Sequence, residues 1–581
     1  MKNYVENYPR PQLIRDSFIL LDGEWDFAFD ENSSGESNSW YTGFSTNKTI
    51  RVPFTYETKA SGIDVQKVYD CVWYQRNVAL DREDGKRVII NFEGSDYETK
   101  VWVNGKVAGT HRGGYSRFGF DITDLIVDGE NLITVSCKDS LDKAQPRGKQ
   151  RWVRKSHDCW YVQTTGIWKS VWIEYVPEVY VASLKLTPDV DNSLIKIEGT
   201  LNRESNCLVA AEISFDGDFV SAGSASMTGD RRFSFTVNVA NRKYPWWVMK
   251  WTPESPDLYD LTIKLLDEEN EIIDEVKSYF GMRDIRISGE NVLLNGVPLY
   301  QKLILDQGYW EESHLTPPSE QALIDDIDKI MALGYNGVRK HMKVEDERFL
   351  YWADVKGLLV WSEFPATYEF TDDALENFTD EWMEVVRQNY SHPSVITWTP
   401  FNESWGVFQI KHDKAQQDFT QAIYYLTKSF DKMRPVICND GWEHTISDII
   451  TLHDYEEDTV AFSDRYADKY ALLENETAFS KRMFAMADGF EYKGQPVIIS
   501  EFGGIAVDGQ GNGWGYGNKV TNEEDFLDRF GRITDAIKGI PYCCGYCYTQ
   551  VSDVQQEVNG LLFENHEFKF SPEKIKEIND R

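Results

Sequence analysis

The pattern that most constrains the fold lies in the C-terminal half of the chain, where short apolar segments alternate with amphipathic stretches from about residue 295 onward. The stretch SEQALIDDIDKIMALG has the period of a helix, and the apolar segments have the length of buried strands. Eight strand candidates follow in order: 299–305, 335–339, 357–362, 395–401, 434–438, 448–452, 496–500 and 544–549. Eight strands with intervening helices over about 285 residues predict a (β/α)8 barrel, which we assign to residues 286–581.

The N-terminal half carries a different pattern, typical of all-β structure. Residues 1–178 contain short segments rich in Val, Ile, Trp and Tyr between Gly, Asp and Asn turns, and Asn104-Gly105 has the signature of a hairpin. Residues 179–285 contain strands with the spacing of an immunoglobulin-like module. Because 581 residues are too many for one hydrophobic core, we expect three domains, two β-sandwiches followed by the barrel.

The net charge narrows the class of partner. The chain has 95 acidic and 61 basic residues, which give a formal net charge of −34. The acid is spread along the chain, which is typical of a solvated surface and argues against nucleic acid or an anionic membrane as partner. The start MKNYVENYPRPQL lacks the apolar region of a signal peptide, and no run of about 18 apolar residues occurs. We therefore expect a cytoplasmic protein with no membrane partner.

The eight cysteines lack the short, regular spacing of a disulfide framework, so reduced thiols are expected. Cys543, Cys544 and Cys547 cluster in the apolar segment YCCGYCYTQ, with no histidine at ligand spacing. We therefore expect no metal site there.

Two acidic residues come directly after strands of the predicted barrel. Glu403 follows Asn402 after the fourth strand, and Glu501 follows the seventh. Reactive groups of such barrels lie at the C-terminal ends of the strands, and strands four and seven lie nearly opposite each other. A carboxyl pair about 5–5.5 Å apart suits retaining glycoside hydrolysis, whereas a wider gap suits inversion. The sequence therefore indicates a two-carboxylate glycosidase, although it does not fix the gap.

Longer motifs resemble glycoside hydrolase family 2, the family of β-galactosidases and β-glucuronidases. The resemblance covers nearly the whole chain: YPRPQ, LDGEWDFAFD, VWVNGKVAGTHRGGYSRF, QPRGKQ, YVQTTGIW, YFGMRDI, NGVRKHMKVEDERFLYWADVKGLLVW, HPSVITWTPFNESWG and PVIISEFGG. It implies a jelly-roll sugar-binding domain at 1–178, an immunoglobulin-like domain at 179–285 and a catalytic TIM barrel at 286–581. It further implies that Glu403 is the general acid/base and Glu501 the nucleophile.

The same resemblance assigns roles to residues beside the two carboxylates. Asn402 is expected to hydrogen-bond the sugar 2-hydroxyl, a contact that strengthens in the transition state. Tyr455 is expected to hydrogen-bond the nucleophile, with Asp454 and His453 as alternatives for that place.

The two carboxyl groups need opposite charge states. Glu403 must stay protonated near neutral pH, which requires desolvation by a neighbour such as Trp405 or the charge of its ionised partner. Glu501 must stay ionised, and Arg339, after the second strand, is the candidate source of positive charge; a purely structural ion pair is the alternative for this arginine.

Further candidates for the sugar pocket come after the other strands or in a glycine-rich loop. They are Asp306, His341, Trp361, Glu363, Trp442 and, as a wall of the site, Trp514. The eighth strand ends in Tyr548, Thr549 and Gln550, where many family members carry a tryptophan.

The sugar is less constrained than the chemistry. The β-glucuronidases carry an Asn-x-Lys motif whose lysine pairs with the uronate carboxylate, and here the stretch before Gly560 reads Glu557-Val558-Asn559. Because a desolvated carboxylate needs a cationic partner, the missing lysine lowers the rank of a uronide, with Arg339, Lys340 or Lys519 as substitutes. We rank a β-galactoside or α-L-arabinoside first, a β-glucuronide or β-galacturonide second and a β-mannoside third.

The remaining expectations concern the mode of action. The jelly-roll domain closes one side of the pocket in the resembling family, which favours exo action on terminal sugars. A two-carboxylate mechanism requires no cofactor. The alternative from another class is a non-catalytic carbohydrate-binding protein, and the architecture is compatible with a homo-oligomer although no residue pattern indicates an interface.

Overall fold

The computed structural model describes residues 4–240, 247–480, 482–509 and 513–581. Its first part is built from antiparallel sheets of six strands, in the order β3-β2-β4-β10-β7-β8, and of four strands, in the order β1-β12-β5-β9, with a two-stranded pair β6/β11. One buried cluster, which includes Trp25, Val101, Ile90 and Ile173, draws side chains from both larger sheets. The elements are β1 (Phe18–Leu20), β2 (Gly23–Phe29), η1 (Trp40–Thr42), β3 (Lys48–Val52), β4 (Cys71–Leu80), β5 (Lys86–Phe92), β6 (Ser95–Asp96), β7 (Glu98–Val103), β8 (Lys106–Arg112), β9 (Phe118–Asp121), β10 (Gly129–Lys138), β11 (Gly166–Ile167) and β12 (Val171–Pro177).

The second part folds two long strands onto themselves. The register between β14 and β15 shifts at Thr200/Ser205, so the first half of β14 pairs with β13 and its second half pairs with β16. Ile197 of the first half and Val209 of the second half belong to one buried cluster, so the two halves pack face to face as a sandwich. The elements are β13 (Val181–Asp189), β14 (Leu194–Phe215), β15 (Asp218–Asn238), β16 (Tyr259–Leu266) and β17 (Ile272–Phe280).

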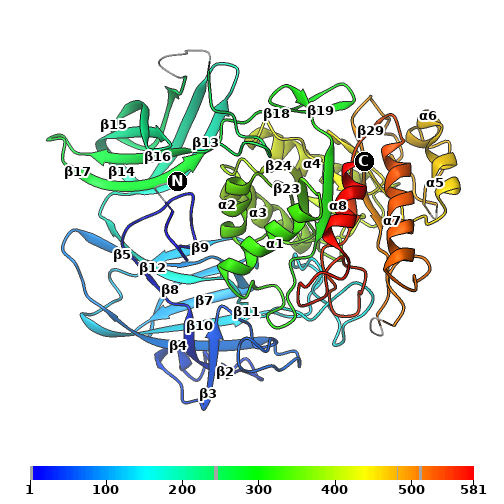
Figure 1. The fold of residues 1–581 in the computed structure, drawn as a ribbon. Helices are drawn as coiled ribbons and strands as arrows, with labels where there is room; N and C mark the ends of the chain where they lie inside the picture. Colours follow the sequence, from blue (N-terminus) through cyan, green and yellow to red (C-terminus); the bar gives the residue numbers. More distant parts are fainter. Residues whose placement is uncertain (1–3, 241–246, 481, 510–512) are drawn as a thin grey trace.

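The third part is a curled parallel sheet in the order β24-β23-β22-β21-β29-β28-β27, surrounded by helices. Figure 1 shows the two sandwiches side by side on one flank of this barrel. The strands are β18 (Ile285–Ser288), β19 (Asn291–Leu294), β20 (Val297–Pro298), β21 (Gln301–Asp306), β22 (Gly337–Lys340), β23 (Leu359–Glu363), β24 (Val395–Thr399), β25 (Phe401–Asn402), β26 (Asn439–Asp440), β27 (Ile450–His453), β28 (Val497–Gly503) and β29 (Cys543–Thr549). The helices are α1 (Glu320–Ala332), α2 (Glu347–Lys356), α3 (Asp372–Asn389), α4 (Lys414–Phe430), α5 (Thr459–Tyr466), α6 (Lys469–Leu473), α7 (Glu523–Lys538) and α8 (Pro572–Asp580).

The predicted fold class is confirmed, but the fifth strand of the barrel departs from the prediction. Residues 434–438 form no ladder strand: Val436 makes an isolated bridge to Trp398, and the short β26 pairs with β25 further along. The Val436 amide donates to the Asp448 carboxylate at 2.9 Å, so a side chain occupies the place of a strand partner. The connection from β26 to β27, residues 441–449, is described throughout and contains no helix.

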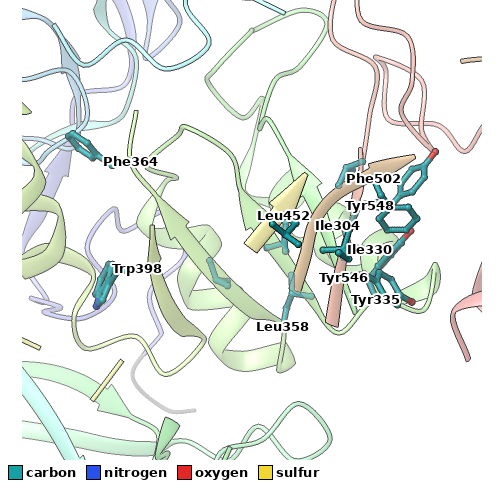
Figure 2. Packing of buried hydrophobic residues seen from close by; sticks show 14 of the residues in the cluster. Ile304, Ile330, Tyr335, Leu358, Phe364, Trp398, Leu452, Phe502, Tyr546 and Tyr548 are labelled. Carbon is teal, nitrogen blue, oxygen red and sulfur yellow. The ribbon is translucent and has the colours of Figure 1, made fainter. Parts of the chain in front are cut away.

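Side chains of the barrel strands alternate between two cores, as a period of two requires. Ile304 and Tyr548 face the helices and pack in the outer cluster, which Figure 2 shows with Ile330, Tyr335 and Tyr546. Leu303, Leu305, Leu359 and Trp361 face the interior and form a separate cluster with Ile498.

This alternation corrects two of the predicted pocket residues. Trp361 is fully buried in the interior cluster, and its indole N–H donates to Gln301 Oε1 at 2.7 Å. Asp306 follows the inward-facing Leu305. Its carboxylate accepts hydrogen bonds from Lys340 Nζ at 2.5 Å and from the Gly308 amide at 2.8 Å. Both residues therefore serve the packing of the barrel. No helix in the described part of the chain has the length and apolar character needed to cross a membrane.

Replacing Trp361 tests this assignment. Trp361→Ala removes a fully buried indole, so we expect the barrel to lose about 3–5 kcal/mol of unfolding free energy. Thermal unfolding measures it, with Trp514→Ala, at a half-buried loop position, as the control that should shift the transition less. An unchanged transition with a raised KM would instead place Trp361 in the sugar pocket.

Candidate active site

Glu403 is held in an unusual backbone conformation at the end of the fourth barrel strand. Its φ is 51°, in the left-handed region that side chains other than glycine rarely adopt. The Glu403 amide donates to the Asp440 carbonyl at 2.9 Å, and the Ser404 amide donates to Asn439 Oδ1 at 2.9 Å. The segment β26 therefore fixes the direction of the Glu403 side chain, which keeps 22% of its surface exposed.

Glu501 lies within β28 and is buried. A carboxylate oxygen of Glu501, one of Glu403 and a ring nitrogen of His453 all lie within 4.8 Å of one another. The carboxyl ends of parallel strands thus bring together two acids that are almost a hundred positions apart in the sequence.

Arg339 organises the acids around Glu501. Its guanidinium is fully buried and donates to Glu363 Oε2 at 2.6 Å and to Glu501 Oε1 at 2.8 Å. It also reaches Asn402 Oδ1 at 2.7 Å and Asp440 Oδ2 at 2.8 Å. One inward-facing cation therefore ties together the ends of four strands of the barrel.

The second oxygen of Glu501 is held by Tyr455. The Tyr455 hydroxyl donates to Glu501 Oε2 at 2.5 Å and lies 3.1 Å from Thr549 Oγ1. The Tyr455 ring stacks on Tyr516, with ring centroids 3.4 Å apart. Of the alternatives for this place, Asp454 uses its carboxylate to bind Arg465 and the Tyr466 hydroxyl, and only its backbone amide contacts Glu501, at the carbonyl, 3.0 Å away.

His453 lies between the two carboxylates. Its Nδ1 is 2.8 Å from Glu403 Oε1 and 3.4 Å from Glu501 Oε2, and its Nε2 is 3.0 Å from Asp440 Oδ2. Burial lowers the pKa of His453, but the charges of Glu501 and Asp440 outweigh it and raise this pKa to about 10. The imidazole is therefore protonated at neutral pH and bridges three acids.

This imidazolium changes the expected charge state of Glu403. Burial raises the pKa of the Glu403 carboxyl, but the hydrogen bond and charge of His453, with the charges of Lys149 and Arg339, hold it below its usual value. We expected desolvation to keep Glu403 protonated; here the hydrogen bond to His453 opposes desolvation, and the two groups lie close enough to share a proton.

The other predicted residues lie at several distances from this group. Glu363 binds Arg339, and His341 Nδ1 is 2.9 Å from Glu363 Oε1. Trp442 packs edge-on against His453, with ring centroids 5.6 Å apart. Trp514 is tied to the first domain, because its indole N–H donates to the Asp158 carbonyl at 2.9 Å. Residues 510–512 of the same loop lie outside the described residues.

The site also includes residues that the sequence patterns did not indicate. The segment between β10 and β11, residues 139–165, runs along the barrel in Figure 1 and contributes Lys149, Trp160 and Tyr161. The Trp160 ring packs edge-on against Trp405, two positions after Glu403, with centroids 5.0 Å apart. The motifs QPRGKQ and YVQTTGIW mark this segment in the sequence, but they carry no spacing that predicts a contact with the barrel.

The group of Glu403, His453 and Glu501 is also the one set of three or more His, Cys and acid groups in the described residues that is compact enough for a metal ion. As a metal ligand His453 would have to be neutral, so a metal ion there would compete with the proton that the neighbouring carboxylates favour.

Comparison with known proteins identifies the class. Models of glycosyl hydrolases family 2 match residues 18–177 (sugar binding domain), 179–283 and 285–579 (TIM barrel domain). The chain belongs to glycoside hydrolase family 2, as the sequence motifs indicated.

The relatives differ in the sugar that their names state. A putative β-glucuronidase of Formosa agariphila is 29% identical over 345 residues, which are 57% of this chain and 40% of the relative. A β-galactosidase of Thermoanaerobacter pseudethanolicus is 29% identical over 374 residues, 62% of this chain and 48% of the relative. This chain thus matches less than half the length of these two relatives.

Solved structures share the whole architecture at low identity. A Bifidobacterium dentium β-glucuronidase has a TM-score of 0.82 at 21% identity, over 99% of this chain and 98% of the other. An Eisenbergiella tayi β-galacturonidase has a TM-score of 0.77 at 20% identity, over 98% of each chain. At these identities the likeness shows the fold alone.

The shared proton generates a prediction about pH dependence. Glu403 and His453 together hold one proton, and they lose it only when the pH exceeds the raised pKa of His453. The value of kcat/KM should therefore stay high into the alkaline range. In His453→Asn the same proton must come from Glu403 alone, so the alkaline limb of kcat/KM should move to lower pH by at least about one unit.

A pH–rate profile measures this shift, and His412→Asn is the control because His412 is exposed and pairs with Asp488. A His453→Asn enzyme with an unmoved alkaline limb would show that His453 does not share the catalytic proton.

Proposed function

We propose that the protein is a retaining exo-β-glycosidase with Glu403 as general acid/base and Glu501 as nucleophile. The observation that carries the proposal is the approach of one oxygen from each carboxylate to within 4.8 Å. Such a pair is too close to leave room for the water that an inverting enzyme needs, and suits direct attack on the anomeric carbon.

The contacts of the two acids support these roles. Arg339 and Tyr455 each donate to one oxygen of Glu501, which stabilises the ionised nucleophile. In the first step Glu501 forms a bond to the anomeric carbon as the glycosidic bond breaks, and the leaving oxygen takes a proton from Glu403, which takes it in turn from His453 Nδ1, 2.8 Å away. This step leaves Glu403 as a carboxylate and His453 neutral. In the second step water attacks the anomeric carbon and displaces Glu501, and the proton of the water passes through Glu403 back to His453.

Asn402 is the residue that we propose binds the sugar 2-hydroxyl. Its Oδ1 accepts from Arg339, which fixes the orientation of the amide. Its Nδ2 is buried and has no hydrogen-bond partner among the described residues. An amide donor held in this way suits the sugar 2-hydroxyl, because buried donors without a partner cost free energy until a ligand fills them.

The first domain supports exo action, because residues 147–162 close one side of the barrel mouth. The Arg147 amide donates to the Ala366 carbonyl at 2.9 Å, and the Tyr368 hydroxyl donates to the Gly148 carbonyl. For the sugar we propose a β-galactoside or α-L-arabinoside. The alternative is a β-glucuronide or β-galacturonide, which the names of several relatives favour.

Replacing each acid tests the mechanism. Glu501→Gln should lower turnover of p-nitrophenyl glycosides by at least about a thousandfold, because the nucleophile is lost. Glu403→Gln should slow substrates with poor leaving groups far more than p-nitrophenyl glycosides, whose leaving group needs no proton. Initial rates measure both effects, with Glu567→Gln, at an exposed position, as control.

The anomer of the first product and a covalent trap complete the test. Proton NMR should show the anomer of the substrate first, the β-anomer from a β-galactoside and the α-anomer from an α-L-arabinoside, and a 2-deoxy-2-fluoro glycoside should label Glu501 in a peptide digest. The opposite anomer first would exclude retention. A protein that binds sugars without turnover, and in which Glu403→Gln changes nothing, would be a carbohydrate-binding protein instead.

A further inference from the structure

Two buried charged side chains reach the site from segments outside the barrel strands. Lys149 lies in the first-domain segment and is 9% exposed, and Glu557 lies beyond β29 and is 2% exposed. Tyr161 joins them, because its amide donates to the Lys149 carbonyl at 2.8 Å and its hydroxyl donates to Glu557 Oε2 at 2.6 Å. The two charged residues therefore belong to one wall.

Contacts on both sides connect this wall to the catalytic acids. At Gly148 an added Cβ would lie 2.3 Å from the Met342 carbonyl oxygen, so the segment is pressed onto the residue after His341. On the other side, Trp514 pairs with Glu557 in a bridge and packs on Tyr516. Tyr516 in turn stacks on Tyr455, which binds Glu501.

The charge of Lys149 also acts on the catalytic group. Burial would lower the pKa of Lys149, but Cys159, Glu557, Tyr368 and Glu403 raise it above its ordinary value. No described carboxylate lies within 4.0 Å of the Lys149 ammonium in an ion pair, although Cys159 lies beside it. The ammonium is therefore charged, buried and available to a ligand.

The other cationic side chains near the site already bind groups of the protein. Arg339 is shared among Glu363, Asp440 and Glu501. Lys340 pairs with Asp306 and Glu345, and Lys519 donates to the Gly513 carbonyl at an exposed position. Arg339, Lys340 and Lys519, which the sequence offered as partners for a uronate carboxylate, are therefore already paired within the protein.

The balance of charge opposes an additional carboxylate. In the described residues the acids at the site, Glu363, Glu403, Asp440, Glu501 and Glu557, outnumber the cations Arg339, His453 and Lys149. Burial raises the pKa of Glu557, and the charge of Lys149 and the hydrogen bonds of Tyr161 and Asn559 oppose that effect. A bound uronate would add another negative charge to this excess and would compete with Glu557 for Lys149. Each oxygen of Glu557 has one donor, Tyr161 or Asn559, and retains a lone pair for a hydroxyl.

We propose that Lys149 and Glu557 bind hydroxyl groups of a neutral terminal sugar and select against uronates. Lys149 donates to a hydroxyl oxygen, and Glu557 accepts from a hydroxyl hydrogen. The inference rests on the proposed function, because the sugar must lie against Glu403 and Glu501 to reach this wall.

Rates on matched substrates test the selection. For the wild-type protein, kcat/KM should be at least about tenfold higher on p-nitrophenyl β-galactoside or α-L-arabinopyranoside than on p-nitrophenyl β-galacturonide and β-glucuronide. Isothermal titration of Glu501→Gln with galactose and galacturonate provides a readout without turnover, and galactose should bind more tightly.

Two variants assign the selection to the wall. Glu557→Gln removes the negative charge at nearly constant volume, so it should lower kcat/KM for the neutral sugar by about tenfold or more and narrow the ratio of neutral sugar to uronide. Lys149→Met should raise KM for the neutral sugar. The controls, Glu567→Gln and Lys143→Met, alter exposed positions near each residue and should leave the ratio unchanged.

The outcomes separate this inference from the proposed function. Preferred turnover or tighter binding of a uronide, with Glu501 still labelled by the trap, would overturn the selection and leave the mechanism standing. An unchanged ratio in a natively folded Glu557→Gln protein would also overturn it. Absence of any label on Glu501, by contrast, contradicts the proposed mechanism, and the titration with free sugars then still decides the selection.

Discussion

The site depends on one buried cation. Arg339 has no exposed surface, and burying a guanidinium is costly unless its donors are all paired. Here Glu363, Glu501 and Asp440 supply the opposite charge, and Asn402 and the Ser500 carbonyl supply further acceptors. Removal of this cation would leave three buried acids without the charge that they share. The position of Glu501 is therefore a consequence of the charge balance inside the barrel.

From Arg339 a chain of charged contacts runs to Glu403 through Asp440 and His453. Asp440 pairs with both, at 2.8 Å from Arg339 and 3.0 Å from His453, and their charges overcome its burial and hold its pKa far below the usual value. The contact with Asp440 fixes the Nε2 side of His453, and its Nδ1 lies toward Glu403. The imidazole therefore lies between a fully buried acid and the partly exposed Glu403.

Features that repeat along the chain could be predicted from the sequence, whereas features that depend on one particular side-chain contact could not. Alternation along the chain predicted the barrel, and the position after strands four and seven predicted Glu403 and Glu501. The sequence could not show toward which face the side chain of such a residue points. Asp306 follows the inward-facing Leu305 and binds Lys340, and Trp361 packs in the interior cluster of the barrel, so neither side chain lines the pocket. The prediction of the fifth strand was wrong for a similar reason, because the Asp448 carboxylate accepts a hydrogen bond from the Val436 amide.

The residues that sequence reasoning missed have partners hundreds of positions away. The Tyr161 hydroxyl binds Glu557, 396 positions later, and no local period signals such a contact. These contacts join the barrel to the first sandwich beside Glu403 and Glu501. Trp160 packs on Trp405, two positions after Glu403, and Tyr161 binds Glu557. An isolated barrel would expose these partners and lose Lys149, whereas Arg339 and the acids that it binds lie on the barrel itself. If the proposed wall binds the sugar, the loop of the first domain can therefore change the choice of substrate without moving the acids.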